Sequence, residues 1–288
     1  MSKRRLVVLL SDTHGGHKLG LLSPETVIYD EDESGNLRPY TPDLMAMQRY
    51  LWELYTGHIK SVRELAGRDE IIVVHNGDVT QGLKYPEHLV STRLSDQVLI
   101  GFCNLKPWLE LRNVRTVRVV KGTASHVLGE GSSEILIARM LAQAYPNKDV
   151  QALYHGLLDV GGVTFDCAHH GPFPGSRNWL KGNVARYYLR SLMLDDVLHG
   201  RDPPRVVARA HYHVYVRETL RLEVEGQEHA SDLIITPSYC GVGDHGRRVT
   251  RSTSLQTHGL VACEVVGGEL RDVHPFKETL DLRTYEQV

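Results

Sequence analysis

The chain has 288 residues, of which 41% are hydrophobic and 24% are charged, with 33 Lys and Arg against 35 Asp and Glu. This length suffices for one large domain with a substantial core, and the composition is that of an ordinary globular protein. The near-zero formal charge argues against nucleic-acid binding through bulk charge and leaves room only for a local basic patch.

The chain begins with "MSKRRLVVLLSD", in which two arginines precede an apolar run. That run covers only the five residues Leu6–Leu10 before Ser11 and Asp12, which is too short for an export signal. No later apolar run reaches the length needed to span a membrane. We therefore expect a cytoplasmic protein that has no membrane partner.

Six short runs rich in Val and Ile predict buried strands. They cover residues 5–10, 70–75, 114–120, 163–169, 205–211 and 232–238. Longer segments with helical spacing cover 41–67, 91–112, 132–145 and 183–200. Thr41 followed by Pro42 predicts the start of the first helix, while Gly67 and Gly200 predict helix ends.

Strands that alternate with helices indicate an α/β protein. From about residue 205 the pattern becomes rich in β-structure, with alternating residues around "GG" that predict antiparallel hairpins. We predict a two-sheet β-sandwich flanked by helices, formed by a single domain over residues 1–288. Residues around 20–67 form a helical and polar insertion, in which "YDEDESGNLRPY" at 29–40 is a surface segment.

The four cysteines are far apart and form no C-x-x-C pair, which argues against a zinc ribbon or a redox motif. The sequence is instead rich in histidine, with 16 residues. Five predicted strands end in residues that bind metals. These are Asp12 with His14, Asp78, His126, His169 with His170, and His211 with His213.

Each of these motifs alone has a structural explanation, as a turn, a buried pair or alternate residues on one strand face. Their recurrence at five strand ends favours a shared site, because ligands bind beyond the carboxyl ends of strands in open α/β sheets. A pair of divalent metals needs a bridging carboxylate, and Asp78 is the natural bridge because Gly77 lets the backbone approach closely.

The ordered set "SDTHG", "NGDVTQG", "GTASH", "AHHG" and "AHYHV" resembles the calcineurin-like metallophosphoesterase superfamily over residues 6 to about 215. The resemblance implies a β-sandwich flanked by helices and two divalent transition metals (Mn, Fe, Zn or Ni, with Mn favoured). It implies that Asp12, His14, Asp78 and His213 hold the first metal. Asp78, His211 and either His169 or His170 would hold the second, with His169 favoured because it continues its strand. His126 would contact the scissile phosphate and assist the leaving group.

The sequence departs from the family pattern in its third motif. The family has an asparagine ligand for the second metal, whereas this loop reads "GTASH", so Thr123 or Ser125 would supply a hydroxyl or a bound water and the second site should be looser. Val127 follows His126 where an acid is usual, and Glu130 or Glu134 are the candidate substitutes. This Gly-Thr-x-x-His variant resembles metallophosphoesterases carried by phages and prophages.

A second departure is "GDVTQG", where the family's phosphatases have Gly-Asp-x-x-Asp-Arg-Gly. Without the arginine a dianionic monoester is less well supported, so phosphodiesters are the expected substrates. Two loops could contact the substrate, and nucleotides or nucleic acid are reasonable substrates because aromatic rings accompany the arginines. Their candidate residues are Arg177, Asn178 and Trp179 in one loop, and Arg247 and Arg248 in the other.

The sequence thus predicts a dimetal phosphoesterase in which a metal-bound hydroxide attacks the phosphorus of a phosphodiester. A phosphomonoesterase with the same site is the alternative within this class. A non-catalytic metal-binding scaffold on the same fold is the alternative from another class, because the third motif is altered.

Overall fold

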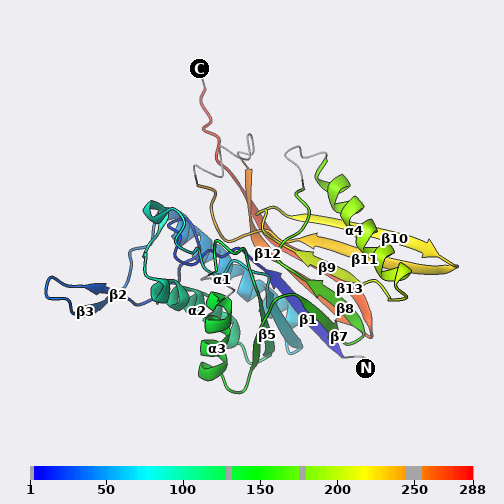
Figure 1. Ribbon diagram of the computed structural model, residues 1–288, viewed down its shortest axis with the longest axis horizontal. Coiled ribbons are helices and arrows are strands. Elements are labelled where there is room, and N and C mark those ends of the chain that lie inside the picture. Colours follow the sequence, from blue (N-terminus) through cyan, green and yellow to red (C-terminus); the bar gives the residue numbers. More distant parts are fainter. Residues whose placement is uncertain (1–2, 128–131, 175–179, 244–254, 288) are drawn as a thin grey trace.

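The computed structural model describes residues 3–127, 132–174, 180–243 and 255–287. The fold is mixed α/β, as predicted: the described residues form a six-stranded sheet, a five-stranded sheet, a two-stranded sheet and four α-helices (Figure 1). Among them no helix combines the length and the apolar character that crossing a lipid bilayer requires.

The six-stranded sheet has the strand order β13-β12-β1-β4-β5-β6. Its members are β1 (Arg4–Leu10), β4 (Glu70–His75), β5 (Val114–Val120), β6 (Asp149–Leu153), β12 (Leu255–Val266) and β13 (Glu269–Asp281). The first four run parallel to one another, and β12 and β13 are the predicted antiparallel hairpin. Leu10 pairs with His75, and His75 with Val119, so β1, β4 and β5 end at the same edge.

The five-stranded sheet has the order β10-β11-β9-β8-β7. Its members are β7 (Gly156–Val160), β8 (Val163–Cys167), β9 (Val206–Arg209), β10 (Val216–Val224) and β11 (Gln227–Ile235). β8 and β9 are parallel, with Cys167 paired to Ala208, so the loops that follow them also leave from one edge. The short strands β6 and β7 were not predicted, because neither contains the run of Val and Ile that marks the others.

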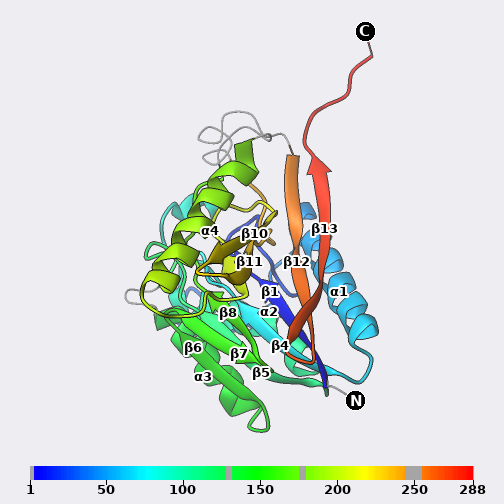
Figure 2. The ribbon, with the colours of Figure 1, turned by 90° about the vertical axis from the view of Figure 1, so that its right-hand side faces the viewer.

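Alternating side chains of the strands face two different cores, as the pleat of a strand requires. Leu6, Val8 and Leu10 of β1 pack with helices α1 (Ala46–Ala66), α2 (Leu94–Leu109) and α3 (Ser132–Ala144). Val7 and Leu9 face the other way and share a core with residues of the five-stranded sheet, including Phe165. The far face of that sheet packs on α4 (Lys181–Leu198), so α1 and α4 lie on opposite sides of the molecule (Figure 2).

Two local predictions need correction. The first helix begins at Ala46 and not after Thr41, because the Gln48 side chain accepts a hydrogen bond from the Met45 backbone N–H at 3.0 Å and caps the helix there. Its predicted end is confirmed, since Gly67 has a φ of 58° and follows directly. Most of the polar segment 29–40 is exposed, yet it forms the hairpin of β2 (Ile28–Glu31) and β3 (Leu37–Tyr40).

Candidate metal centre

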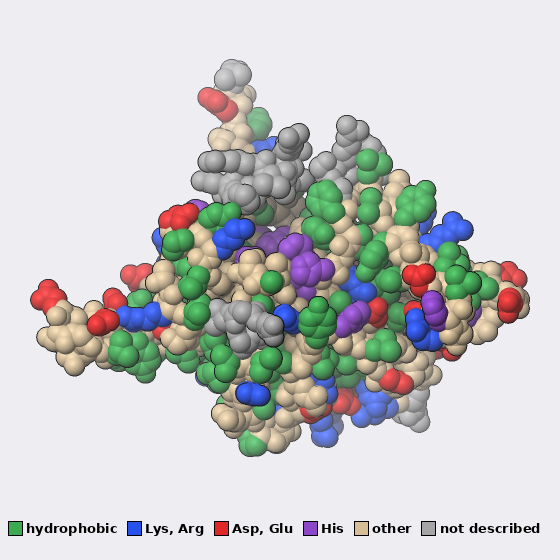
Figure 3. All heavy atoms as spheres, viewed as in Figure 1, with side chains coloured by type: hydrophobic (Ala, Val, Ile, Leu, Met, Phe, Trp, Pro, Cys, Tyr) green, Lys and Arg blue, Asp and Glu red, His purple; other side chains and the backbone are tan. Residues whose placement is uncertain are grey.

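The loops that follow β1, β4, β5, β8 and β9 meet in one place, where histidine side chains gather on the surface in Figure 3. Ligand atoms within 4.8 Å of one another define four overlapping groups of three residues. They are Asp12 with His14 and His213, His14 with Asp78 and His126, Asp12 with Asp78 and His169, and His169 with His170 and His211. The structure thus brings together every predicted Asp and His ligand.

Asp12 lies at the centre of the cluster and is fully buried. Its Oδ1 atom lies 3.5 Å from His213 Nε2, 3.8 Å from His14 Nε2 and 3.9 Å from His169 Nε2. The other oxygen, Oδ2, accepts a hydrogen bond from Ser11 Oγ at 2.6 Å. No described residue donates a hydrogen bond to Oδ1. A buried carboxylate oxygen without a donor is costly unless a cation completes its environment.

Asp78 follows β4 and can lie close to the rest of the cluster because two neighbouring residues are glycines. Its Oδ2 atom lies 3.0 Å from His169 Nε2. A Cβ atom on Gly122 would lie 2.1 Å from Asp78 Oδ1, and one on Gly77 would lie 2.4 Å from His169 Nδ1. Both positions therefore require glycine for the site to form. The role predicted for Gly77 agrees with this geometry, and Gly122 has the same role on the other side.

His169 is oriented by a backbone carbonyl. Its Nδ1 atom lies 2.7 Å from the carbonyl oxygen of Asn76, which can only accept, so Nδ1 donates and Nε2 faces the carboxylates. Burial lowers the pKa of His169, but Asp78 and Asp12 outweigh burial and raise this pKa to about 9. In the metal-free protein Nε2 therefore carries a proton at neutral pH, and a metal ion that binds there must displace it.

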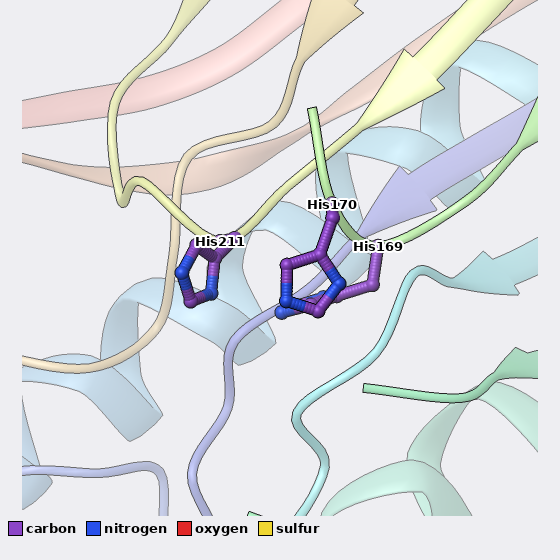
Figure 4. Close-up of side chains that lie close together, drawn as sticks. All are labelled: His169, His170 and His211. Carbon is purple, nitrogen blue, oxygen red and sulfur yellow. The ribbon is translucent and has the colours of Figure 1, made fainter. Parts of the chain in front are cut away.

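His170 occupies a different environment from its neighbour. It is exposed, whereas His169 is buried, and its ring centroid lies 4.8 Å from that of His211. Figure 4 shows the three rings close together, with His169 and His170 from the loop after β8 and His211 from the loop after β9. Of the two adjacent histidines, only His169 lies within 4 Å of both carboxylates, which agrees with the preference for His169 in the sequence.

The two carboxyl groups are ionised at neutral pH. Burial raises the pKa of each, but His213 and His14 near Asp12, and His169 near Asp78, hold both pKa values well below the ordinary range. Burial lowers the pKa of His211 to about 4, so this imidazole is neutral. Two buried negative charges beside a neutral imidazole are a donor set that could hold metal ions.

Thr123 supplies the hydroxyl of the altered third motif. Its backbone N–H donates to Asp78 Oδ1 at 2.6 Å, and its hydroxyl donates to Asp78 Oδ2 at 3.1 Å. The same hydroxyl lies 3.1 Å from His211 Nδ1, so it connects the two side chains. Ser125, the other candidate, is exposed and forms no side-chain hydrogen bond with any described residue. Of the two, only Thr123 contacts the cluster.

His126 packs edge-on against His14, with ring centroids 4.8 Å apart. Its Nδ1 atom donates to the carbonyl oxygen of Gln81 at 2.6 Å, which leaves Nε2 as the acceptor of the neutral ring. Burial lowers the pKa of His126, so the neutral form prevails at pH 7. A backbone carbonyl thus orients this ring where an acid was expected.

Of the two acids proposed for that role, Glu130 lies outside the described residues. Glu134 is 1% exposed at the start of α3 and accepts a hydrogen bond from Ser133 Oγ at 2.7 Å. Its Oε1 atom has no hydrogen-bond partner among the described residues. Burial raises the pKa of Glu134 to about 7. The carboxyl is therefore buried close to the Asp78 loop without orienting His126.

Backbone conformation singles out the same residues. Within the described ranges, seven residues other than glycine have a left-handed φ, and five of them are Asp12, His14, Asp78, His211 and His213. Such conformations are uncommon outside glycine and concentrate at functional sites. The backbone conformation thus singles out, independently of residue type, five of the residues that the sequence predicts to bind metal.

The sequence interpretation missed the residues that hold the histidine loops in place. Arg209 is 2% exposed and donates from Nη1 and Nη2 to the two oxygens of Asp166, both at 3.0 Å. Its Nε donates to Tyr188 Oη at 3.1 Å. Arg209 precedes His211 by two residues and Asp166 precedes His169 by three, so this pair ties the two loops together. Opposite charges inside two apolar strands that end in histidine motifs are the signal that would have identified it.

The predicted substrate contacts Arg177, Asn178, Trp179, Arg247 and Arg248 lie outside the described residues. The neighbouring part of the first loop is described: Phe173 is 56% exposed, and its ring centroid lies 5.4 Å from that of Tyr212. Tyr212 in turn packs against His211 at 5.0 Å. An aromatic surface therefore borders the cluster on the His211 side.

No family model matches this chain, and no curated protein matches it either. The buried Asp and His groups of the cluster could nevertheless hold metal ions.

Proposed function

We propose that this protein is a dimetal phosphoesterase of the calcineurin-like metallophosphoesterase superfamily, with the helix-flanked β-sandwich of that family, and that it prefers phosphodiesters. One observation carries the proposal. Asp12 Oδ1 is buried, accepts no hydrogen bond from any described residue, and lies 3.9 Å from His169 Nε2, which in turn faces the second ionised carboxylate, Asp78, at 3.0 Å. A buried oxygen of this kind is what a bound cation would satisfy.

The donor groups suggest two adjacent positions that share Asp78. Asp12, His14, Asp78 and His213 would hold one metal ion, and Asp78, His169 and His211 would hold the other, with His170 beside it. The mixed set of carboxylates and imidazoles suits divalent transition metals, and manganese is the metal that we propose. Two such ions would supply activation of a water molecule at neutral pH and would offset the charge of a phosphoryl group.

His126 is the residue proposed to act on the leaving group. Its Nδ1 proton is committed to the Gln81 carbonyl, so only Nε2 can exchange a proton with substrate. The ring is neutral before substrate binds, and the negative charge of a phosphate ester next to Nε2 would favour protonation there. Protonated Nε2 would then donate to the departing oxygen.

The preference for diesters rests on Gly82. This residue lies where the family's phosphatases carry an arginine, and its φ is 76°. A Cβ atom on Gly82 would lie 2.3 Å from the carbonyl oxygen of Ser125, so no larger side chain fits at this position without moving the loop. A dianionic monoester would lack that cationic contact, whereas a diester carries one negative charge fewer.

The test is metal analysis of the purified protein together with hydrolysis of two aryl esters that share one leaving group, a phosphodiester and a phosphomonoester. The proposal predicts close to two transition-metal ions per chain after manganese loading and faster turnover of the diester. A large excess of monoester turnover would identify the phosphomonoesterase alternative. Bound metal without hydrolysis of either ester would identify the scaffold alternative.

A further inference from the structure

A groove of about 710 Å³ opens at the other end of the six-stranded sheet from the metal cluster. It lies where β1, β4 and β5 begin and where α1 and α2 end, and it is lined by residues of α1, of the three strands and of the turns that follow the two helices. In Figure 3 several Lys and Arg side chains lie along the lower edge of the molecule, apart from the histidine cluster at its centre. Besides Arg4, the lining includes four arginines: Arg63 in α1, Arg68 and Arg112 in the turns after α1 and α2, and Arg115 in β5.

The acidic groups of the groove are already paired. Glu70 accepts from Lys3 at 2.7 Å, Asp69 accepts from Arg4 at 3.0 Å, and Glu110 lies 3.5 Å from Lys106. By contrast, the four arginines are exposed, and none has an acidic partner in the described part of the chain. The groove therefore presents four guanidinium groups whose charge is not compensated by the protein.

Helix ends explain only part of this charge. Arg63 lies in the last turn of α1, and Arg68 and Arg112 follow α1 and α2, where the helix dipole stabilises a cation. Arg115 lies inside β5 and has no such role. Burial lowers the pKa of Lys148, and the positive charge of Arg115 lowers it further.

We propose that this groove is a second binding site, distinct from the metal centre, for a compact anion that carries two or more phosphates. Guanidinium groups bind phosphate oxygens through paired N–H donors, and several arginines around one hollow match several phosphates. The volume falls within the usual range of about 300 to 1,000 Å³ for small-molecule sites. The proposal stands on these residues alone and does not depend on the phosphoesterase activity.

The test measures binding of inorganic tripolyphosphate to the full-length protein by calorimetry at low salt. The double variant Arg112→Gln/Arg115→Gln should weaken binding at least tenfold. The matched control Arg139→Gln/Arg190→Gln removes the same charge from two exposed arginines on α3 and α4 and should change Kd less than twofold. Equal affinities for the parent and both double variants would overturn the proposal.

Three further measurements keep the result clear. Single Arg68→Gln should weaken binding by a smaller factor, which provides a second test if the double variant does not fold. A single-stranded oligonucleotide serves as the extended source of phosphates, and its binding through the groove without tripolyphosphate binding would overturn a compact ligand. The groove double variant and the parent should hydrolyse the aryl phosphodiester at the same rate. Absence of anion binding in the groove and absence of the proposed phosphoesterase activity are therefore separate outcomes.

Discussion

The two large sheets contribute different side chains to the same cluster. Loops of the six-stranded sheet bring Asp12, Asp78, His14 and His126, whereas loops of the five-stranded sheet bring only histidines. Asp12, His14 and Asp78 are at most 4% exposed, while His211 and His213 are half-buried and His170 is exposed. One sheet thus fixes the negative charge inside the core, and the other supplies histidines that, apart from the buried His169, lie nearer the surface.

This difference indicates which side chains determine each property of the site. Buried carboxylates held by short hydrogen bonds set the position and the charge that attract a cation. Imidazole side chains nearer the surface change position more easily, and water competes with them for a bound cation. We therefore expect the largest losses from changes on the six-stranded side and the most subtle changes where the two sides meet.

The largest effect should come from Asp78→Asn. This variant keeps an oxygen that can accept from Thr123 but removes the charge shared by the two donor groups. We expect both metal equivalents to weaken and phosphodiester hydrolysis to fall at least about 10³-fold. Metal analysis and kcat measure this, with the exposed Asp43→Asn as the matched control. Full metal content in the variant would refute the shared role of Asp78.

The next effect separates chemistry from metal binding on the same side. His126→Ala removes Nε2 but none of the residues assigned to the metals, so metal content should stay unchanged. Turnover of a diester with a poor leaving group should fall about 10²-fold or more, and that of a good leaving group much less. His199→Ala, at the exposed end of α4, is the control. Equal losses on both esters would exclude proton donation by His126.

A third effect concerns Glu134, a further buried acid close to the six-stranded sheet whose ionisation lowers the stability of the fold. Its pKa is about 7 in the folded protein against 4.5 ordinarily, so the folded state holds the proton more tightly. The stabilisation that comes from this tighter proton binding is fully present below pH 4.5, where both states are protonated. The folded state loses it as the pH rises from 4.5 to about 7, because the unfolded state ionises first. Glu134→Gln should therefore stabilise the metal-free protein at pH 8 by roughly 3 kcal/mol, on the order of 10²-fold in the unfolding constant.

Urea unfolding at pH 4.5 and pH 8 measures this effect. The gain from Glu134→Gln should be present at pH 8 and absent at pH 4.5, whereas the exposed Glu64→Gln should change stability little at either pH. A gain of the same size at both values would mean that packing, and not ionisation, is responsible.

The smallest effect should come from Thr123, where the two sides meet. Thr123→Asn introduces an amide oxygen, a better metal ligand than a neutral hydroxyl, and should tighten the weaker metal equivalent about tenfold without changing the stronger one. Manganese titration of the metal-free protein separates the two equivalents. Thr123→Val, which removes the bonds to Asp78 and His211, should weaken the same equivalent. If both variants leave it unchanged, Thr123 has no part in metal binding.

Much of the site could be predicted from sequence because strand ends are marked locally. Runs of Val and Ile that stop at Asp or His gave Asp12, Asp78, His169 and His211, and parallel pairing brings such ends to one edge. The choice between His169 and His170 could only be argued from strand continuity. It depends on which ring turns toward the Asn76 carbonyl, and that is a tertiary contact.

Other features had no local signal at all. Nothing near Gly82 or Gly122 in the sequence reveals that a Cβ atom would meet Ser125 or Asp78, because these contacts join separate loops. The start of α1 was misplaced because Thr41 and Pro42 form a strong cap signal, while the capping bond from Gln48 lies several residues later. Distance in the chain, more than residue type, limited the predictions.

The left-handed backbone of the five ligand residues has a consequence for the protein without metal. Each such residue costs on the order of 1 kcal/mol, so the empty cluster carries a sum comparable to a large fraction of the 5 to 15 kcal/mol that stabilises a typical domain. A ligand that binds only the assembled loops offsets this cost. On the proposed function, metal loading would be the last step of folding, and these loops would be the first part of the molecule to open when metal is withdrawn.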